Sequence, residues 1–190
     1  MATTFTRDHQ GVRIPQAGTY ALDKGHTTVE FVGRHLMITK VRGRFTDFDG
    51  QIVIGESPEQ SSVEVTIQTA SVDSSDEKRD GHLRSPDFLD FENYPTITFR
   101  STDVQVNSDG TAKVTGDLTV KDVTRPVTLD VEFDGAQADP CGGQRLGFSA
   151  HTQIDREDWG LTWNVALETG GVLVGKKIRL EFNVEAVRQS

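Results

Sequence analysis

Apolar and polar residues alternate along most of this chain after residue 18, and this alternation restricts the fold more than any other feature of the sequence. A strand that buries one face and exposes the other shows this period of two. Such strands are typical of antiparallel sheets with a single buried side. We therefore expect about eight to ten antiparallel strands. The clearest of them lie at residues 63–68, 114–120, 127–133, 146–154 and 178–186.

Helical character is confined to residues 74–90, where Pro86 interrupts it. Because so short a segment cannot cover the apolar face of a large sheet, the remaining solutions are two packed sheets or a closed barrel. A barrel of about eight strands is either filled by its own side chains or holds one small ligand. Gly33, Gly43 and Gly116 fall in the inward phase of their strands. They either leave interior volume or mark bends in strongly coiled strands.

The phase of the alternation slips by one residue at two places. Phe45 is odd-numbered whereas Phe48 is even-numbered, and a similar slip separates Phe99 from Val104. An uncorrected slip would turn the apolar side chains to the opposite face of the sheet. We expect a β-bulge near residues 46–48, which would restore the phase and help to close a barrel.

The composition fits one domain and excludes some classes of function. The chain of 190 residues is predicted to form a single domain over residues 18–188, preceded by a flexible N-terminal tail over residues 1–17. The net charge of −9 argues against nucleic-acid binding, which needs a basic face. One cysteine, Cys141, cannot form an internal disulfide. No apolar segment has the length of a signal peptide or a membrane span, so we expect a cytoplasmic protein.

Patterns that would indicate a metal site or a catalytic site are weak, and we predict neither. No two of the 5 histidines lie within eight residues of each other, and neither His-x-Glu nor Cys-x-x-Cys occurs. The chain has no Gly-x-Ser-x-Gly elbow. An enzyme that acts on an apolar substrate, with His82, Asp80 or Asp158 as acid or base, stays open as an alternative.

Several segments together resemble the YceI-like proteins. The longest is "SVDSSDEKRDGHLRSPDFLDFENYPTITFRST", and the likeness continues in "GTYALDKGHTTVEFVGRHL", "VRGRFTDFDGQI", "VTGDLTVKDVTRPVTLDV" and "IDREDWGL". The resemblance implies an all-β, lipocalin-like antiparallel barrel of about eight strands with a short helical insertion. It also implies binding of a polyisoprenoid, including isoprenoid quinones or their precursors, in an elongated apolar cavity, with no cofactor required. Some members of the family form homodimers, which makes a homodimer an expectation here.

The strand phase indicates which side chains line such a cavity. We predict a lining made of Phe31, Phe45, Phe99, Leu118, Val120, Phe148, Trp163, Leu180 and Phe182, with His35 as a polar contact for the head of the ligand. Each of the apolar residues is also explained as plain core. In the insertion, four apolar residues are predicted to cover the barrel opening as a lid, held by Asp80, His82 and Arg84: Leu83, Phe88, Leu89 and Phe91.

We therefore expect a non-enzymatic protein that transports or stores a long isoprenoid or another lipid. Besides the enzyme, the other alternative is a stress-related interaction module whose barrel is filled. Lys40, Arg42 and Arg44 share the outward phase of one strand. They form either a solvated face or a contact with an anionic partner or membrane surface.

Overall fold

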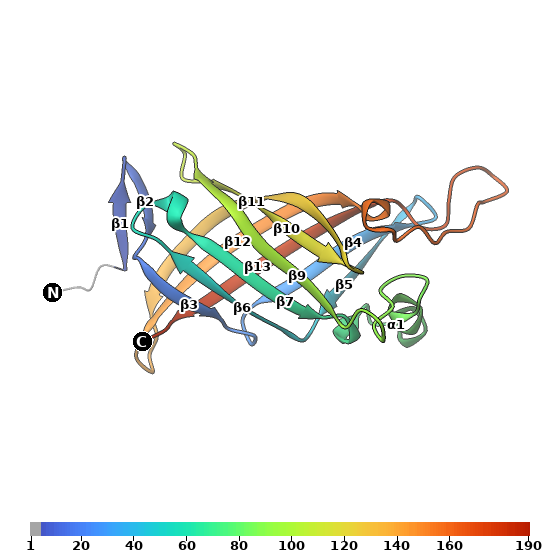
Figure 1. The fold of residues 1–190 in the computed structure, drawn as a ribbon, viewed down its shortest axis with the longest axis horizontal. Coiled ribbons are helices and arrows are strands. Elements are labelled where there is room, and N and C mark those ends of the chain that lie inside the picture. Colours follow the sequence, from blue (N-terminus) through green and yellow to red (C-terminus); the bar gives the residue numbers. More distant parts are fainter. Residues whose placement is uncertain (1–4) are drawn as a thin grey trace.

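The computed structural model describes residues 5–190, and most of them lie in antiparallel strands around a single barrel (Figure 1). Within these described residues, one α-helix and three short 3-10 helices complete the fold. The elements are β1 (Thr6–His9), β2 (Val12–Pro15), β3 (Gly18–Leu22), β4 (Thr28–His35), β5 (Thr39–Phe45), β6 (Phe48–Ile54), η1 (Pro58–Gln60), β7 (Ser62–Gln68), η2 (Thr69–Ser71), β8 (Val72–Asp73), α1 (Glu77–Arg84), β9 (Thr96–Val106), β10 (Ala112–Val120), β11 (Val123–Ala138), β12 (Gln144–Asp155), η3 (Arg156–Trp159) and β13 (Lys177–Arg188).

The barrel closes because β13 pairs with strands on both of its sides. On one side it pairs with β12 along its whole length, from Arg145↔Val187 to Asp155↔Lys177. On the other side β3 pairs with its C-terminal end and β4 with its N-terminal half. Likewise β5 pairs with β4 and β6 pairs with β3, so β5 and β6 together fill one strand position of the barrel. The expected antiparallel barrel with eight strand positions and one short helix is confirmed.

The two phase slips have different structural causes. At the first, β5 ends at Phe45 and β6 begins at Phe48, so the strand breaks where the sequence suggested a bulge. The break arises because β5 pairs with β4 whereas β6 pairs with β3. At the second slip the register between β9 and β10 shifts between Thr115 and Gly116. Thr102 is left without a partner there, which is a β-bulge.

The inward glycines of β5 and β10 accommodate aromatic rings. A Cβ added at Gly43 would lie 2.2 Å from Cζ of Phe31, and one at Gly116 would lie 2.5 Å from Cζ of Phe99. Both rings therefore lie against the barrel wall, directly over a glycine. This cross-strand arrangement covers the backbone of a glycine with an aromatic side chain. The volume above these two glycines is occupied by the protein's own side chains.

The N-terminal residues differ from the sequence prediction. The sequence predicts a flexible tail over residues 1–17, but β1 and β2 form a hairpin with a turn at Gln10 and Gly11. Arg7 fixes this hairpin to the barrel by donating hydrogen bonds to the backbone carbonyls of Gly55 and Glu56. The tail prediction is wrong for these residues because the contacts that hold the hairpin against the barrel come from groups distant in sequence. Residues 1–4 of the predicted tail lie outside the described residues.

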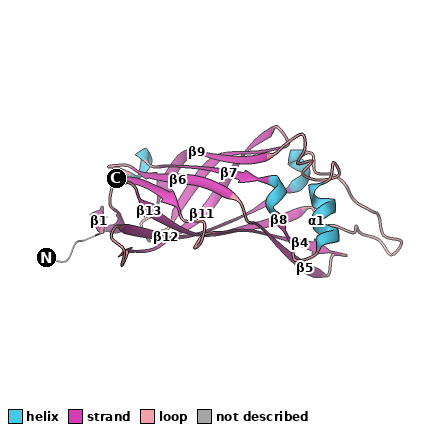
Figure 2. Ribbon diagram, turned by 90° about the horizontal axis from the view of Figure 1, so that it is seen from below, coloured by secondary structure: helices cyan, strands magenta, loops and turns pink. Residues whose placement is uncertain are grey.

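The helical insertion lies at the barrel end opposite to the β1–β2 hairpin (Figures 1 and 2). Helix α1 starts at an N-cap, where Asp76 accepts a hydrogen bond from the backbone N–H of Arg79 at 3.0 Å. Asp80 is buried and accepts hydrogen bonds from the Ser74 backbone at 2.8 Å and the Ser74 hydroxyl at 2.5 Å. Arg84 donates to the carbonyls of Ala70 and Val72. These polar contacts attach the insertion to the chain that precedes it. None of the described helices is long and apolar enough to cross a membrane.

Candidate ligand cavity

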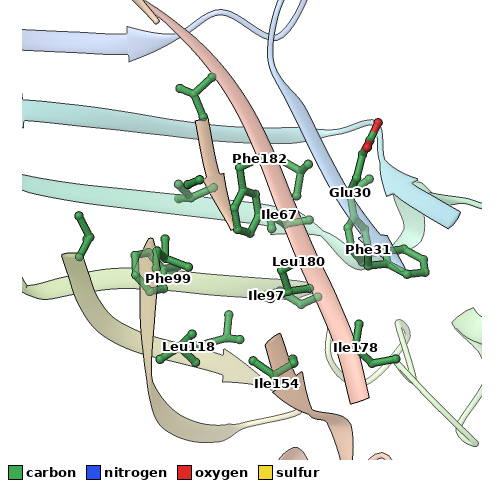
Figure 3. Close-up of a pocket in the computed structure, with 18 of the residues that line it drawn as sticks. Glu30, Phe31, Ile67, Ile97, Phe99, Leu118, Ile154, Ile178, Leu180 and Phe182 are labelled. Atoms are coloured by element: carbon green, nitrogen blue, oxygen red, sulfur yellow. The ribbon is translucent and has the colours of Figure 1, made fainter. Parts of the chain in front are cut away.

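The barrel encloses a cavity of about 940 Å³ that extends from the β1–β2 hairpin to α1. This volume is near the upper end of the range of about 300–1,000 Å³ found for ligand sites. Its middle section is apolar because successive strands direct their Val, Ile, Leu and Phe residues inward (Figure 3). Charged side chains reach the cavity mainly from the β1–β2 hairpin and from α1, and Glu30 of β4 is a charged residue beside the apolar section (Figure 3). The labelled apolar residues of Figure 3 come from β4, β7, β9, β10, β12 and β13, so the wall is built from around the whole barrel.

The structure places all ten predicted ligand-contact residues on the cavity wall. They are Phe31, His35, Phe45, Phe99, Leu118, Val120, Phe148, Trp163, Leu180 and Phe182. Leu118 and Val120 also belong to the buried core, and Phe31 and Phe45 pack against it with their ring centroids 5.6 Å apart. These inward-facing residues therefore belong to the hydrophobic core and line the cavity at the same time. That these residues contact a ligand stays a prediction.

Three of the four predicted lid residues line the cavity at the α1 end. These are Leu83, Phe88 and Leu89, and the last two are buried. Phe91 is 36% exposed and is not among the described residues that line the cavity, so the prediction is wrong for this side chain. The chain turns at Asp90, whose φ is 50°, and the backbone N–H of Phe91 donates back to the Arg84 carbonyl. This turn takes Phe91 away from the opening.

An aromatic cluster stands beside this lid. The ring of His82 lies edge-on to Trp163, with centroids 4.4 Å apart, and edge-on to Phe88 at 5.0 Å. Nε2 of His82 lies 2.9 Å from a carboxylate oxygen of Asp87, which fixes the orientation of the imidazole. His82 lines the cavity, whereas the sequence analysis predicts that it holds the insertion or, in the enzyme alternative, acts as an acid or base. The cluster gives the opening an apolar edge with one polar group.

A buried cation, Arg156, secures the loop that carries Trp163. Its guanidinium donates to the backbone carbonyls of Leu161 at 2.6 Å, Gly175 at 3.0 Å and Val174 at 3.2 Å. The side chain is only 4% exposed, and its burial lowers the pKa of the guanidinium from the usual value. Sequence reasoning missed this residue. Its even number continues the inward phase of β12, and this was the signal that could have found it.

The other proposed acids and bases lie away from the cavity. Asp80 is engaged by Ser74, and Asp158 is exposed. Neither is among the described residues that line the cavity. Their placement gives no geometric support to the enzyme alternative, which retains only His82 at the cavity edge.

A polar cluster on the barrel contains groups that sequence reasoning did not connect. Asp23, His26 and Glu185 have ligand atoms within 4.8 Å of one another, a spacing that could hold a metal ion. However, Nη1 of Arg145 lies 2.5 Å from Asp23 and 2.8 Å from Glu185. The Arg145 hydrogen bond, with smaller help from His26, lowers the pKa of Asp23 to about 2. The guanidinium therefore supplies the positive charge that these carboxylates need.

Comparisons with known proteins agree with this architecture. Residues 20–186 match the family model of the YceI-like domain. A UPF0312 protein of Ectopseudomonas mendocina is 40% identical, over 91% of this chain and 89% of that protein. The crystal structure of a YceI protein of Campylobacter jejuni has a TM-score of 0.71 at 30% identity, covering 83% of this chain and 90% of the other. A structure described as a polyisoprenoid binding domain from Saccharophagus degradans has a TM-score of 0.65 at 14% identity, covering 92% and 100%, and shares the fold.

Proposed function

This chain belongs to the YceI-like domain family, and we propose that its barrel binds one long apolar molecule of the polyprenyl or isoprenoid-quinone class and carries or stores it unchanged. The observation that supports the proposal most strongly is the cavity of about 940 Å³ with an apolar middle section. The solved polyisoprenoid binding domain of similar fold adds support for this class of ligand.

The shape and polarity of the cavity favour a hydrocarbon chain. Each buried methylene contributes about 0.8 kcal/mol, so a chain of several isoprene units binds tightly with few polar contacts. A polar head would stay at the α1 end, where His35 and His82 line the cavity beside Trp163. The tail would then extend past Leu180 and Phe182 toward the β1–β2 hairpin. A few polar groups at one end are sufficient to orient such a ligand.

The proposal is tested by organic extraction and native mass spectrometry of the protein purified without added lipid. We expect a stoichiometric apolar molecule, and we expect the emptied protein to bind a polyprenol or a quinone with a polyprenyl tail. A saturated fatty acid of matched length serves as the competitor. Tighter binding of the fatty acid would contradict the isoprenoid class, and a protein that binds neither compound would contradict the carrier function.

Two other functions, a filled interaction module and an enzyme, can each be compared with one observation. A filled barrel is disfavoured because the interior holds a cavity of ligand size. The enzyme alternative rests on the contact between His82 and Asp87 at the cavity edge. We expect His82→Gln to retain ligand binding and the bound molecule to be recovered chemically unchanged from both proteins. A modified ligand recovered from the parent protein but not from the His82→Gln variant would favour the enzyme.

A further inference from the structure

The large apolar side chains that are exposed within residues 5–190 gather at one end of the barrel. Leu36, Met37 and Ile38 are 38%, 56% and 72% exposed in the β4–β5 turn, and Val165 is 46% exposed in the loop after η3. Phe91, the other large apolar residue found exposed among the described residues, lies in the insertion at the same end (Figure 1). Single exposed apolar residues are ordinary, but a group gathered at one place marks a binding surface.

The backbone of the β4–β5 turn is strained by its apolar residues. Leu36 and Met37 have φ values of 53° and 61°, and the N–H of Ile38 donates to the His35 carbonyl. Turns with two positive φ values prefer Asn-Gly, because bulky side chains rarely adopt this conformation. Among residues 5–190, the other adjacent pairs with positive φ values are Gln-Gly at residues 10–11, Lys-Asp at residues 121–122, and Gly-Gly at residues 142–143 and 170–171, and none of them carries two apolar side chains. Strain that brings apolar side chains into solvent indicates a functional requirement.

The same hairpin is basic in an otherwise acidic protein. Residues 31–46 contain Arg34, Lys40, Arg42 and Arg44 and no Asp or Glu, whereas the whole chain carries a net charge of −9. Arg42 and Arg44 form ion pairs with Glu181 and Asp73. Among the described residues, Arg34 and Lys40 have no carboxylate within salt-bridge distance. These two cations flank the exposed turn and are available to an anionic partner.

The exposed turn is continuous with the cavity opening. Arg34, His35 and Val41 line the cavity, and all three come from the two strands that carry the turn. The backbone N–H of Leu36 donates to the carbonyl of Leu173, which also lines the cavity, at 2.8 Å. A surface that binds this turn therefore lies directly beside the opening.

We propose that this end of the barrel docks on an anionic lipid bilayer. We call the docking surface the rim, and it consists of Leu36, Met37, Ile38 and Val165 with Arg34 and Lys40. The apolar side chains enter the interface between head groups and acyl chains, while the two cations bind lipid phosphates and carboxylates. This inference rests on the proposed function for its purpose, because the bilayer is the source or destination of the apolar ligand. The attachment itself is measured without added ligand.

The experiment is flotation of the purified protein with phosphatidylcholine vesicles and with mixed phosphatidylcholine and phosphatidylserine vesicles. We expect binding to the mixed vesicles that weakens with added salt. The double variant Leu36→Asn/Met37→Gly gives the turn its preferred residues and should fold well, yet bind at least about tenfold more weakly because two apolar anchors are lost. Lys40→Gln should weaken binding to anionic vesicles roughly fivefold and leave binding to neutral vesicles unchanged.

The matched control is Lys121→Asn/Asp122→Gly, which makes the same replacement in a polar turn near the insertion, where Lys121 contacts Pro86. It should bind vesicles as the parent protein does. Equal binding by the parent and the rim variant, or no vesicle binding by the parent, would overturn the proposal. A dimer that dissociates in the rim variant, without vesicle binding, would instead assign the rim to a second copy of this chain. Polyprenol binding from detergent solution is measured in parallel, so failure of the carrier function is distinguished from failure of docking.

Discussion

Replacing Ala150 by Trp places an indole ring inside the barrel. Ala150 lies on β12, where it pairs with Val131 of β11 and Phe182 of β13, and all three side chains line the cavity. Because the existing side chain is a single methyl group, the new ring must extend into the cavity. The variant therefore occupies space that the proposed ligand needs and leaves the rest of the wall unchanged.

The expected effect on binding follows from the excluded hydrocarbon. If the ring displaces about three to four methylenes at about 0.8 kcal/mol each, binding weakens by roughly 3 kcal/mol. This free energy corresponds to a roughly 100-fold higher Kd. The assay is displacement of a fluorescent polyprenol analogue from the emptied protein. A shortened ligand should regain part of the lost affinity, since it needs less of the cavity.

Stability provides the second half of this test. An indole that enters empty apolar space should change the free energy of unfolding by less than about 1 kcal/mol, whereas overpacking a filled core costs about 1–3 kcal/mol. The control is His151→Trp, because His151 is exposed on the neighbouring position of the same strand. It should leave ligand binding intact. Strong destabilisation by Ala150→Trp together with unchanged ligand binding would show that the space beside Ala150 is not the ligand site.

Three further predictions concern single polar groups and the strained turn. Arg156→Met removes three hydrogen bonds to backbone carbonyls and should lower the free energy of unfolding by about 3 kcal/mol. Proteolysis within residues 160–176 should also become faster. Unchanged stability in urea would contradict the role of Arg156 in holding this loop. The pKa of Asp23 is lowered to about 2, so its contact with Arg145 stabilises the protein above about pH 4 and is lost as the pH falls toward 2. Asp23→Asn should therefore lower the free energy of unfolding at neutral pH by up to about 2 kcal/mol and flatten the acid part of the stability curve. Urea titrations near pH 6 and pH 3 would show both effects. Leu36→Asn/Met37→Gly should raise the free energy of unfolding by about 1–2 kcal/mol, because two left-handed residues lose their strain; a less stable variant in thermal unfolding would argue against strain at this turn.

The alternation of residues gave the barrel interior correctly wherever the wall is made of apolar side chains. Leu118, Phe148 and Leu180 could be placed inward from their phase alone, because a side-chain period of two leaves only two faces. The same rule extends through Ile154 to Arg156, but an arginine in an inward phase contradicts simple hydrophobic patterning. Its hydrogen bonds to carbonyls of a distant loop could not be read from its neighbours.

The two ends of the barrel were harder to predict than its wall. The β1–β2 hairpin has no apolar alternation of its own, and Arg7 stabilises it through carbonyls of residues 55–56. The position of Phe91 depends on the left-handed conformation of Asp90, which is a local backbone choice that periodicity does not report. Both errors come from structure that depends on contacts between distant segments or on a single dihedral angle.

Experimental electron density inside the barrel of the protein purified without added lipid is the most direct measurement. We expect continuous, elongated density that begins beside Trp163 at the α1 end and passes Leu180 and Phe182 toward Ile14 of the hairpin. Organic extraction should remove this density, and a polyprenol should restore it. An interior filled by repacked side chains, or one that stays empty after exposure to polyprenol, would contradict binding of a long apolar molecule in the barrel.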